Sequence, residues 1–268
     1  MIGNFQYQLQ GEQFDAIHAS RADLVVVDVD DCGFTREQVG TIAARKTVLS
    51  YLSIGQASSY RWYWDEEWVD EKADPIAGKA PPWLGPRSAW DKSYEVRYWD
   101  EGWLAILKQS IDRMLACGYA GVVYDVVDAF AYWEKRGEWT AKARMKTLVG
   151  ELMAHGRSKR PAYIGIPNAG VELLTDAAYR ARITAQLCES VYYLGEEPRS
   201  AADSGWATAY LDRVAAEGKQ VFVLEYPQAL ASQKDAIKKA RAKGYVPYTT
   251  TPRLDVLGPV WQDVLKNR

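Results

Sequence analysis

Residues 121–130 read GVVYDVVDAF, an apolar run that ends in the two carboxylates Asp125 and Asp128. Apolar residues stand at both the odd and the even positions of the run, which is typical of a parallel strand that helices cover on both faces. We therefore expect a buried strand over residues 121–128. Removing an ionised carboxylate from water costs several kcal/mol unless it is paired or hydrogen-bonded, so something must compensate for these two acids.

Outward from this run, short apolar segments alternate with amphipathic ones, as in βα units that feed a parallel sheet. The expected strands span residues 5–9, 23–30, 47–55, 121–128, 161–169, 183–193, 220–227 and 245–250. Thr35 is expected to cap a helix, and Gly118, Gly218 and Gly244 stand just past expected helix ends. This pattern predicts an α/β fold, a (β/α)8 TIM barrel that forms a single domain over residues 1–268. A doubly wound sheet is the alternative, but no glycine-rich phosphate loop follows any strand.

One connection is much longer than a βα loop should be: about 45 residues, from Gln56 to Asp100, follow the third strand. Insertions on this side of a barrel lie beside its active face. The insertion and its border are rich in tryptophan, at Trp62, Trp64, Trp68, Trp83, Trp90, Trp99 and Trp103. We expect this cluster to contact a ligand such as a sugar ring, although single members could simply form a small core for the insertion.

Composition excludes several classes of function. The net charge of -2 provides no basic surface, so we expect no nucleic-acid partner. Two histidines and three scattered cysteines leave almost nothing for a Ser-His-Asp triad, a His-ligated metal or a disulfide framework. No apolar segment is long enough to span a membrane, and the N-terminus MIGNFQYQLQ lacks a secretory signal, so the chain as given is expected to be mature or cytosolic.

Carboxylates follow several of the expected strands, at the edge where a barrel of this kind carries its chemistry. They are Asp28, Asp30, Asp125, Asp128, Glu189 and Glu225. Because side chains alternate between faces, Asp125 shares the inward parity of Val123, whereas Asp128 has the opposite parity or lies in the loop. Glycosidic bond cleavage requires two carboxylates with separated pKa values, so this ring of acids favours a glycosidase.

Six segments taken in order resemble the glycoside hydrolase 114 type endo-α-1,4-polygalactosaminidases and the related Pel-polysaccharide hydrolase domains. The segments are YLSIGQASSYRWYW, YEVRYWDEGW, GYAGVVYDVVDAFAYW, IPNAGVELL, ESVYY and GYVPYTTTPRLD. The resemblance implies a (β/α)8 barrel that hydrolyses α-1,4-linked galactosamine polymers of microbial exopolysaccharides and biofilms without a metal or other cofactor. It places the catalytic acids at Asp125, our expected nucleophile, and Glu189, our expected acid/base, although the sequence leaves open which acid plays which role and whether the enzyme is retaining or inverting. The substrate-binding residues that it implies are Asp28, Tyr124, Asp128, Tyr192 and Tyr226. We expect Gln56 and Asn168, at two of the family's motif positions, and the strand-end acid Glu225 to bind substrate as well.

Such a substrate is a polycation, which a carboxylate-lined cleft would attract and hold through charge-assisted hydrogen bonds. The chain departs from the family pattern where Gln56 and Ser58 replace acids and where Pro167 precedes Asn168. These departures leave open a different or partly acetylated amino sugar, and also a non-catalytic glycan-binding barrel or an intracellular enzyme of other chemistry. We expect a monomer that is extracellular or in the cell envelope, as relatives of the family mostly are, while a cytoplasmic location stays open.

Overall fold

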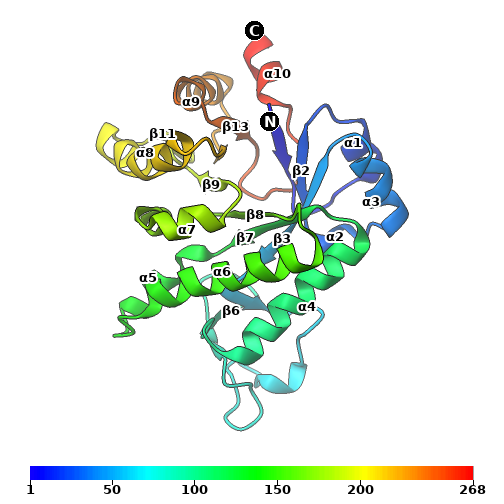
Figure 1. The fold of residues 1–268 in the computed structure, drawn as a ribbon, viewed down its shortest axis with the longest axis vertical. Helices are drawn as coiled ribbons and strands as arrows, with labels where there is room; N and C mark the ends of the chain where they lie inside the picture. The colour runs from blue at the N-terminus through cyan, green and yellow to red at the C-terminus, as the bar shows by residue number, and fades with distance from the viewer. Residues whose placement is uncertain (268) are drawn as a thin grey trace.

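The computed structural model describes residues 1–267, so the last residue of the predicted domain, 268, lies outside it. All eight expected strands are present and their ladders are parallel (Figure 1). In chain order they are β1 (Phe5–Tyr7), β2 (Leu24–Val27), β3 (Thr47–Ser53), β7 (Gly121–Asp125), β8 (Ile164–Pro167), β9 (Gln186–Glu189), β12 (Val221–Glu225) and β13 (Val246–Thr249). Two ladder runs form, β1-β2-β3-β7-β8 and β9-β12-β13.

The two runs meet edge to edge and form a barrel. An isolated parallel bridge between Asn168 and Leu187 joins β8 to β9. At the other seam, the Phe5 and Tyr248 rings of β1 and β13 lie 5.5 Å apart. Gln6 of β1 donates a side-chain hydrogen bond across this seam to the carbonyl of Gly258. All eight strands are therefore arranged around one interior.

The interior of the barrel is a separate apolar core to which every strand contributes. Within strands its members alternate with residues that face the helices, as the period of two requires. They are Phe5, Tyr7, Leu24, Val26, Leu49, Val123, Ile166, Ala185, Leu187, Phe222, Leu224, Val246 and Tyr248. An open doubly wound sheet encloses no such core, so the prediction of a (β/α)8 barrel is confirmed.

Helices cover the outside of the strands and end where the sequence indicates. They are α1 (Phe14–Ala19), α2 (Val29–Cys32), α3 (Arg36–Ala43), α4 (Glu101–Cys117), α5 (Phe130–Glu134), α6 (Ala141–Lys159), α7 (Ala177–Arg182), α8 (Ala201–Ala216), α9 (Leu230–Ala242) and α10 (Trp261–Lys266). Thr35 and Gln38 form a reciprocal capping box at the start of α3, and Gly118 ends α4 in the left-handed conformation. No helix of residues 1–267 has the length and apolar character needed to cross a bilayer.

The long connection after β3 forms a small antiparallel sheet of its own, drawn in cyan and blue-green at the bottom of Figure 1. Its strands are β4 (Gln56–Ser58), β5 (Leu84–Arg87) and β6 (Ser93–Val96), in the order β4-β6-β5. Tyr63, Trp83 and Trp103 pack edge-on or tilted against one another, and Trp83 and Trp103 are fully buried. Much of the tryptophan cluster thus forms a core for the insertion, while Trp62 and Trp90 are exposed.

Each predicted strand runs past the observed C-terminal end; the strand expected over residues 121–128, for example, ends at Asp125 and is followed by a 3-10 turn, Val127–Ala129. The segment expected to continue the second strand to residue 30 instead turns into α2, because the Asp28 carboxylate accepts a hydrogen bond from the Asp30 amide and caps that helix. The sixth predicted strand, residues 183–193, divides into β9 and the first strand of a separate hairpin, β10 (Tyr193–Leu194) with β11 (Glu197–Pro198).

Candidate active site

Two strand-end carboxylates meet at a shared amide. Asp125 ends β7 and Glu189 ends β9, and both accept hydrogen bonds from Nδ2 of Asn168, which directly follows β8. The Asp125 Oδ1 to Nδ2 distance is 2.8 Å and the Glu189 Oε1 to Nδ2 distance is 2.6 Å. Only the NH2 end of the amide can donate, so the pair of carboxylates fixes the orientation of Asn168.

The shared nitrogen also limits the distance between the two bonded carboxylate oxygens, Oδ1 of Asp125 and Oε1 of Glu189. Because both oxygens are bonded to one atom, their separation cannot exceed the two bonds laid end to end, about 5.4 Å. Two carboxyl groups about 5 to 5.5 Å apart suit the attack of one carboxylate on a sugar, with no room for a water between them. A separation of about 6.5 Å or more would suit direct attack by water.

Glu189 has the environment of a proton donor. Burial and then the negative charge of Asp125 raise the pKa of the Glu189 carboxyl to about 7, against the opposing effect of hydrogen bonds from Tyr226 and Asn168. The Tyr226 hydroxyl, just beyond β12, donates to Oε2 of Glu189. Near neutral pH a substantial fraction of Glu189 is therefore protonated and can act as a general acid.

The backbone turns sharply after each of these three residues. Val126, Ala169 and Ser190 follow Asp125, Asn168 and Glu189, and all three have left-handed backbone angles, with φ of 58°, 61° and 51°. Residues other than glycine rarely adopt this conformation, and it is especially unfavourable for a β-branched residue such as Val126. Strain of this kind gathers at functional sites, where the surrounding structure holds it in place.

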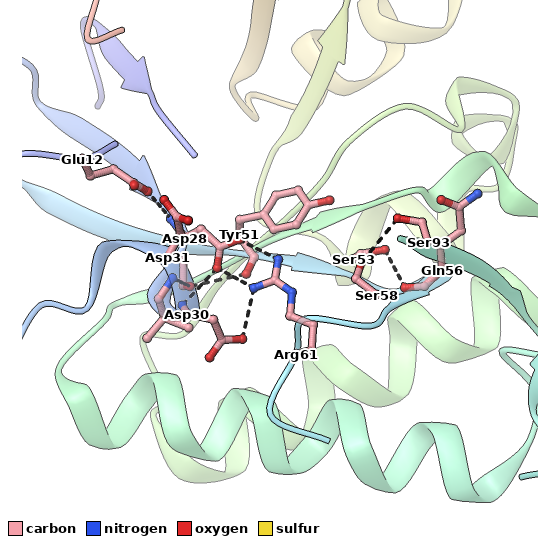
Figure 2. Close-up of polar contacts among 12 residues, drawn as sticks. Glu12, Asp28, Asp30, Asp31, Tyr51, Ser53, Gln56, Ser58, Arg61 and Ser93 are labelled. Carbon is pink, nitrogen blue, oxygen red and sulfur yellow. Dashed lines mark hydrogen bonds and ion pairs between the residues drawn. The ribbon is translucent and has the colours of Figure 1, made fainter. Parts of the chain in front are cut away.

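Asp28 lies in the same barrel mouth but is paired with a cation from the insertion. Arg61 binds it through two parallel hydrogen bonds, Nη1 to Oδ1 and Nη2 to Oδ2, each 2.6 Å long. Nη1 of Arg61 also lies 3.0 Å from Oδ2 of Asp30 (Figure 2). Asp28 is 4% exposed, so this ion pair is almost fully buried.

Gln56 and Asp128 lie on the insertion side of the mouth. Gln56 of β4 is paired with Glu95 of β6, and its Nε2 donates to Oε1 of Glu95 over 3.0 Å. Gln56 stands where the family pattern has an acid, and its partner on the neighbouring strand, Glu95, is itself a buried acid. Asp128 follows β7 in a short 3-10 turn and is exposed. Of the predicted substrate-binding acids, Asp128 is therefore the most accessible.

The Glu225 carboxylate is buried and binds backbone amides. It ends β12, is 1% exposed, and its two oxygens accept the amide N–H groups of Tyr192 and Tyr193 over 2.8 and 3.1 Å. These amides belong to the loop that directly follows Glu189 and Ser190. Glu225 therefore positions the Glu189 loop, and its buried carboxylate is not presented to a ligand.

Two predicted site tyrosines are not brought to the acids. Tyr124 is fully buried on the outer face of β7, and its hydroxyl pairs with that of Tyr163 over 2.7 Å. Tyr192 is also part of the outer core, beneath the helices. The structure thus unites Asp125, Asn168, Glu189 and Tyr226, places Asp28, Gln56 and Asp128 around them, and directs Tyr124 and Tyr192 away.

Four residues at the mouth were missed by the sequence argument: Tyr7, Tyr51, Arg61 and Glu95. Tyr7 and Tyr51 share the inward parity of Phe5 and Leu49, so strand alternation could have identified them. Burial and then the charge of Asp125 raise the pKa of both hydroxyls well above their ordinary value. Arg61 and Glu95 come from the insertion, whose pattern gives no direction for their side chains.

Among residues 1–267, no group of three or more histidine, cysteine, aspartate or glutamate side chains is arranged to hold a metal ion.

Two cavities, of about 470 and 660 Å³, lie away from these acids. The first is at the opposite end of the barrel and the second lies between α4 and α6. What the acids can do together is protonate one oxygen and attack a neighbouring carbon.

The chain is similar in sequence to a family of known proteins and to individual relatives. Residues 2–266 match the glycoside-hydrolase family GH114. An uncharacterized protein of Deinococcus radiodurans is 35% identical over 249 residues, which cover 91% of this chain and 78% of that protein. An uncharacterized protein of Methanocaldococcus jannaschii is 32% identical over 279 residues, which cover 95% and 78%.

Solved structures share the fold at low sequence identity. The glycoside hydrolase domain of PelA from Pseudomonas aeruginosa superposes with a TM-score of 0.74 at 20% identity, covering 96% of this chain and 98% of that domain. Ega3 of Aspergillus fumigatus, solved in complex with galactosamine, has a TM-score of 0.72 at 14% identity, covering 97% and 94%. At these identities the likeness is one of fold.

Proposed function

Because this chain belongs to glycoside hydrolase family GH114, we propose that it is an endo-acting hydrolase of α-1,4-linked, galactosamine-containing exopolysaccharide. The observation that carries the proposal is the Asp125–Asn168–Glu189 arrangement, in which one amide nitrogen holds two strand-end carboxylates within bond-cleaving distance of each other. A glycosidic bond placed over this pair would have a proton donor at its oxygen and a nucleophile at its anomeric carbon.

We assign the two roles from the environments of the acids. Glu189, with its pKa raised to about 7 by burial and by Asp125, donates a proton to the departing oxygen. Asp125 attacks the anomeric carbon and forms a glycosyl-enzyme ester as the leaving-group bond breaks. Glu189, now ionised, then takes a proton from water, whose oxygen displaces Asp125 and restores the starting state. The close spacing of the acids supports this double displacement, which retains the anomeric configuration.

The proposed substrate is a cationic amino-sugar polymer. Support comes from Asp128, an exposed carboxylate three residues from the proposed nucleophile, which suits an ammonium group. Among the proteins of similar fold, Ega3 was solved with galactosamine. A monomeric state, independence from metals and a location outside the cell or in its envelope belong to the same proposal.

The test is cleavage of defined α-1,4-galactosamine oligomers followed by mass spectrometry. We expect shortened oligomers with the wild-type protein, and NMR of the first product should show the α anomer. Asp125→Asn and Glu189→Gln should each lower kcat by at least about 1,000-fold, since each removes one of the two reacting groups. Glu37→Gln, an exposed substitution on α3, is the matched control and should cleave normally.

Three results would contradict the proposal. Saturable binding without products would favour a glycan-binding barrel, and normal turnover of either acid variant would exclude the assigned pair. Initial release of the β anomer would exclude double displacement. Circular dichroism of each variant separates loss of chemistry from loss of fold.

A further inference from the structure

Arg61 is a cation built into a mouth that is otherwise lined with acids. It follows β4 in the insertion and reaches back over the barrel to the end of β2 (Figure 2). Its side chain is 9% exposed, and it is the partner of Asp28 and Asp30. Arg113 lies farther out, 3.8 Å from the other oxygen of Asp30. Arg61 is thus the buried cation of this cluster.

The guanidinium occupies the acceptor positions of Asp28. Oδ1 of Asp28 accepts from Arg61 Nη1 and from the Asp30 amide, and Oδ2 accepts from Arg61 Nη2. Both oxygens are engaged and the charge is offset at 2.6 Å. An ammonium group could bind Asp28 only by displacing Arg61, because two cations on one carboxylate repel each other in a poorly solvated site.

Arg61 is also close to the proposed nucleophile. Its guanidinium carbon lies 5.7 Å from the centre of the Tyr51 ring and 4.9 Å from that of Tyr60. The Tyr51 hydroxyl faces Asp125, whose charge helps burial to raise the hydroxyl's pKa. A single aromatic side chain therefore separates the guanidinium from the reacting carboxylate. A sugar bound beside Asp125 on the β2 side would meet Arg61 and the exposed ring of Tyr60.

The opposite side of Asp125 has no such cation in contact. Asp128 is exposed, and among residues 1–267 no basic side chain lies within ion-pair distance of it. Glu95 is bonded to neutral Gln56, and the nearby Arg136 stacks on Tyr132 instead of pairing with Glu95. The mouth is therefore asymmetric: its carboxylate is free on the β7 side and blocked on the β2 side.

We propose that Arg61 is a specificity-determining residue, whose guanidinium takes the place at Asp28 that a substrate ammonium group would otherwise occupy. On the β2 side of Asp125 the site then favours a sugar with an uncharged substituent, such as an acetamido group, over a sugar with a free amine. An acetamido oxygen suits this position, since Nε–H of Arg61 has no acceptor among residues 1–267. The inference rests on the proposed function, because it concerns which sugar the same site accepts.

The experiment compares kcat/KM for two sets of α-1,4-linked oligomers, fully N-acetylated and fully deacetylated, across matched variants. The readout is the ratio of deacetylated to acetylated kcat/KM. Arg61→Met frees the Asp28 carboxylate and should raise this ratio about tenfold or more, the size of one new charge pair in a partly buried site. Asp28→Asn leaves Arg61 paired with Asp30 alone, so less of its positive charge is offset and the ratio should fall.

Two further variants separate charge from fold. The double variant Asp28→Asn with Arg61→Met removes both charges, and its ratio should fall between those of the two single variants. Arg61→Lys retains a cation but loses the two parallel hydrogen bonds to Asp28 and the Nε–H, so its ratio should lie between those of wild type and Arg61→Met. If Arg61→Met does not fold, the Asp28→Asn, double and Arg61→Lys variants still provide the comparison.

The outcomes distinguish this inference from the proposed function. A ratio that is the same in wild type and all variants overturns the inference while cleavage itself still supports a hydrolase. The inference is also overturned if wild type and Arg61→Met cleave deacetylated oligomers equally fast. The substrate amine would then displace Arg61 without a measurable cost. No cleavage of either set by wild type overturns the proposed function, and the inference falls with it.

Discussion

Asn168 is the residue on which the geometry of the site depends. Its single NH2 group donates to both carboxylates of the proposed catalytic pair and so links their positions. The strained residues Val126, Ala169 and Ser190 hold the backbone just beyond the three members of this arrangement. The chain thus accepts a local cost in stability to aim three side chains from three strands at one point.

Tyr226 should set the upper pH limit of activity. Its hydroxyl donates to Glu189 and lowers that carboxyl's pKa from the value that burial alone would produce. Tyr226→Phe removes the donor, so the pKa of Glu189 should move above 7 and the alkaline limb of kcat against pH should shift upward. Initial rates from pH 5 to pH 9 measure the shift. Tyr192→Phe is the control, because it removes a hydroxyl from the outer core and should leave the alkaline limb in place. An alkaline limb that does not move, or that moves to lower pH, in Tyr226→Phe would contradict the assignment of Glu189 as the acid.

The loops that follow β3 and β7 are locked together at the level of whole elements. The Ile54 amide donates to the carbonyl of Asp125 over 3.0 Å, and the carbonyl of Ile54 accepts from Nε1 of Trp103 over 2.9 Å. Between these contacts, Gly55 packs so closely that a Cβ atom there would lie 2.1 Å from the carbonyl oxygen of Val126. Only glycine fits at this crossing of the two loops.

Gly55→Ala should therefore disable the enzyme by shifting the Asp125 loop. A displacement of about 1 Å at a reacting group can cost about 100-fold in rate, and we expect a fall in kcat of that order. Kinetics on galactosamine oligomers and thermal unfolding measure both effects. Gly40→Ala, in α3 and with no atom within 4 Å of the added carbon, is the control and should leave kcat unchanged. Wild-type kcat in Gly55→Ala would show that the crossing does not position Asp125.

The elements also show what the sequence could and could not predict. Apolar runs located all eight strands, and a period of two gave the inward direction of Asp125, because burial on both faces leaves a strong pattern. The end of β2 was misplaced because Asp28 both continues the strand's parity and caps α2. Arg61 could not be foreseen, since its path over the barrel depends on the fold of the insertion rather than on any local period. Tyr124 directly precedes Asp125 in the sequence, but side chains alternate between the two faces of a strand, so Tyr124 points away from the site.

At the scale of the whole molecule, the barrel buries several carboxyls whose protonation should govern stability. Burial raises the pKa of Glu12, Glu189 and Glu225 to about 7, above the ordinary value of 4.5 for each. Between about pH 4.5 and 7 the folded state holds more protons than the unfolded one, so the free energy of unfolding should fall as pH rises. Each fully responsive group contributes up to about 1.4 kcal/mol per pH unit.

Glu12→Gln should remove about a third of this pH dependence. Oε1 of Glu12 accepts the Asp28 amide, and Oε2 is buried without a partner among residues 1–267, beside Asp31. The glutamine side chain keeps an oxygen that accepts the Asp28 amide and gains an NH2 group that can donate to Asp31. Because it has no charge to bury, the variant should be more stable than wild type above pH 7 by about 1 to 3 kcal/mol. Denaturant unfolding at pH 5, 6, 7 and 8 measures the slope, with Glu37→Gln as the exposed control. An unchanged slope would place the titration elsewhere.

The tie from Trp103 to Ile54 has a further consequence for how the molecule folds. It joins residues 49 positions apart, with almost the whole insertion between them. Closing a loop of that length costs about 3 kcal/mol of chain entropy before the contacts it creates can offset the loss. The barrel strands can pair before this closure, but the turn that bears Asp125 is held only afterwards. We therefore expect refolding chains to regain their secondary structure earlier than their catalytic power, with closure of the insertion as the late step.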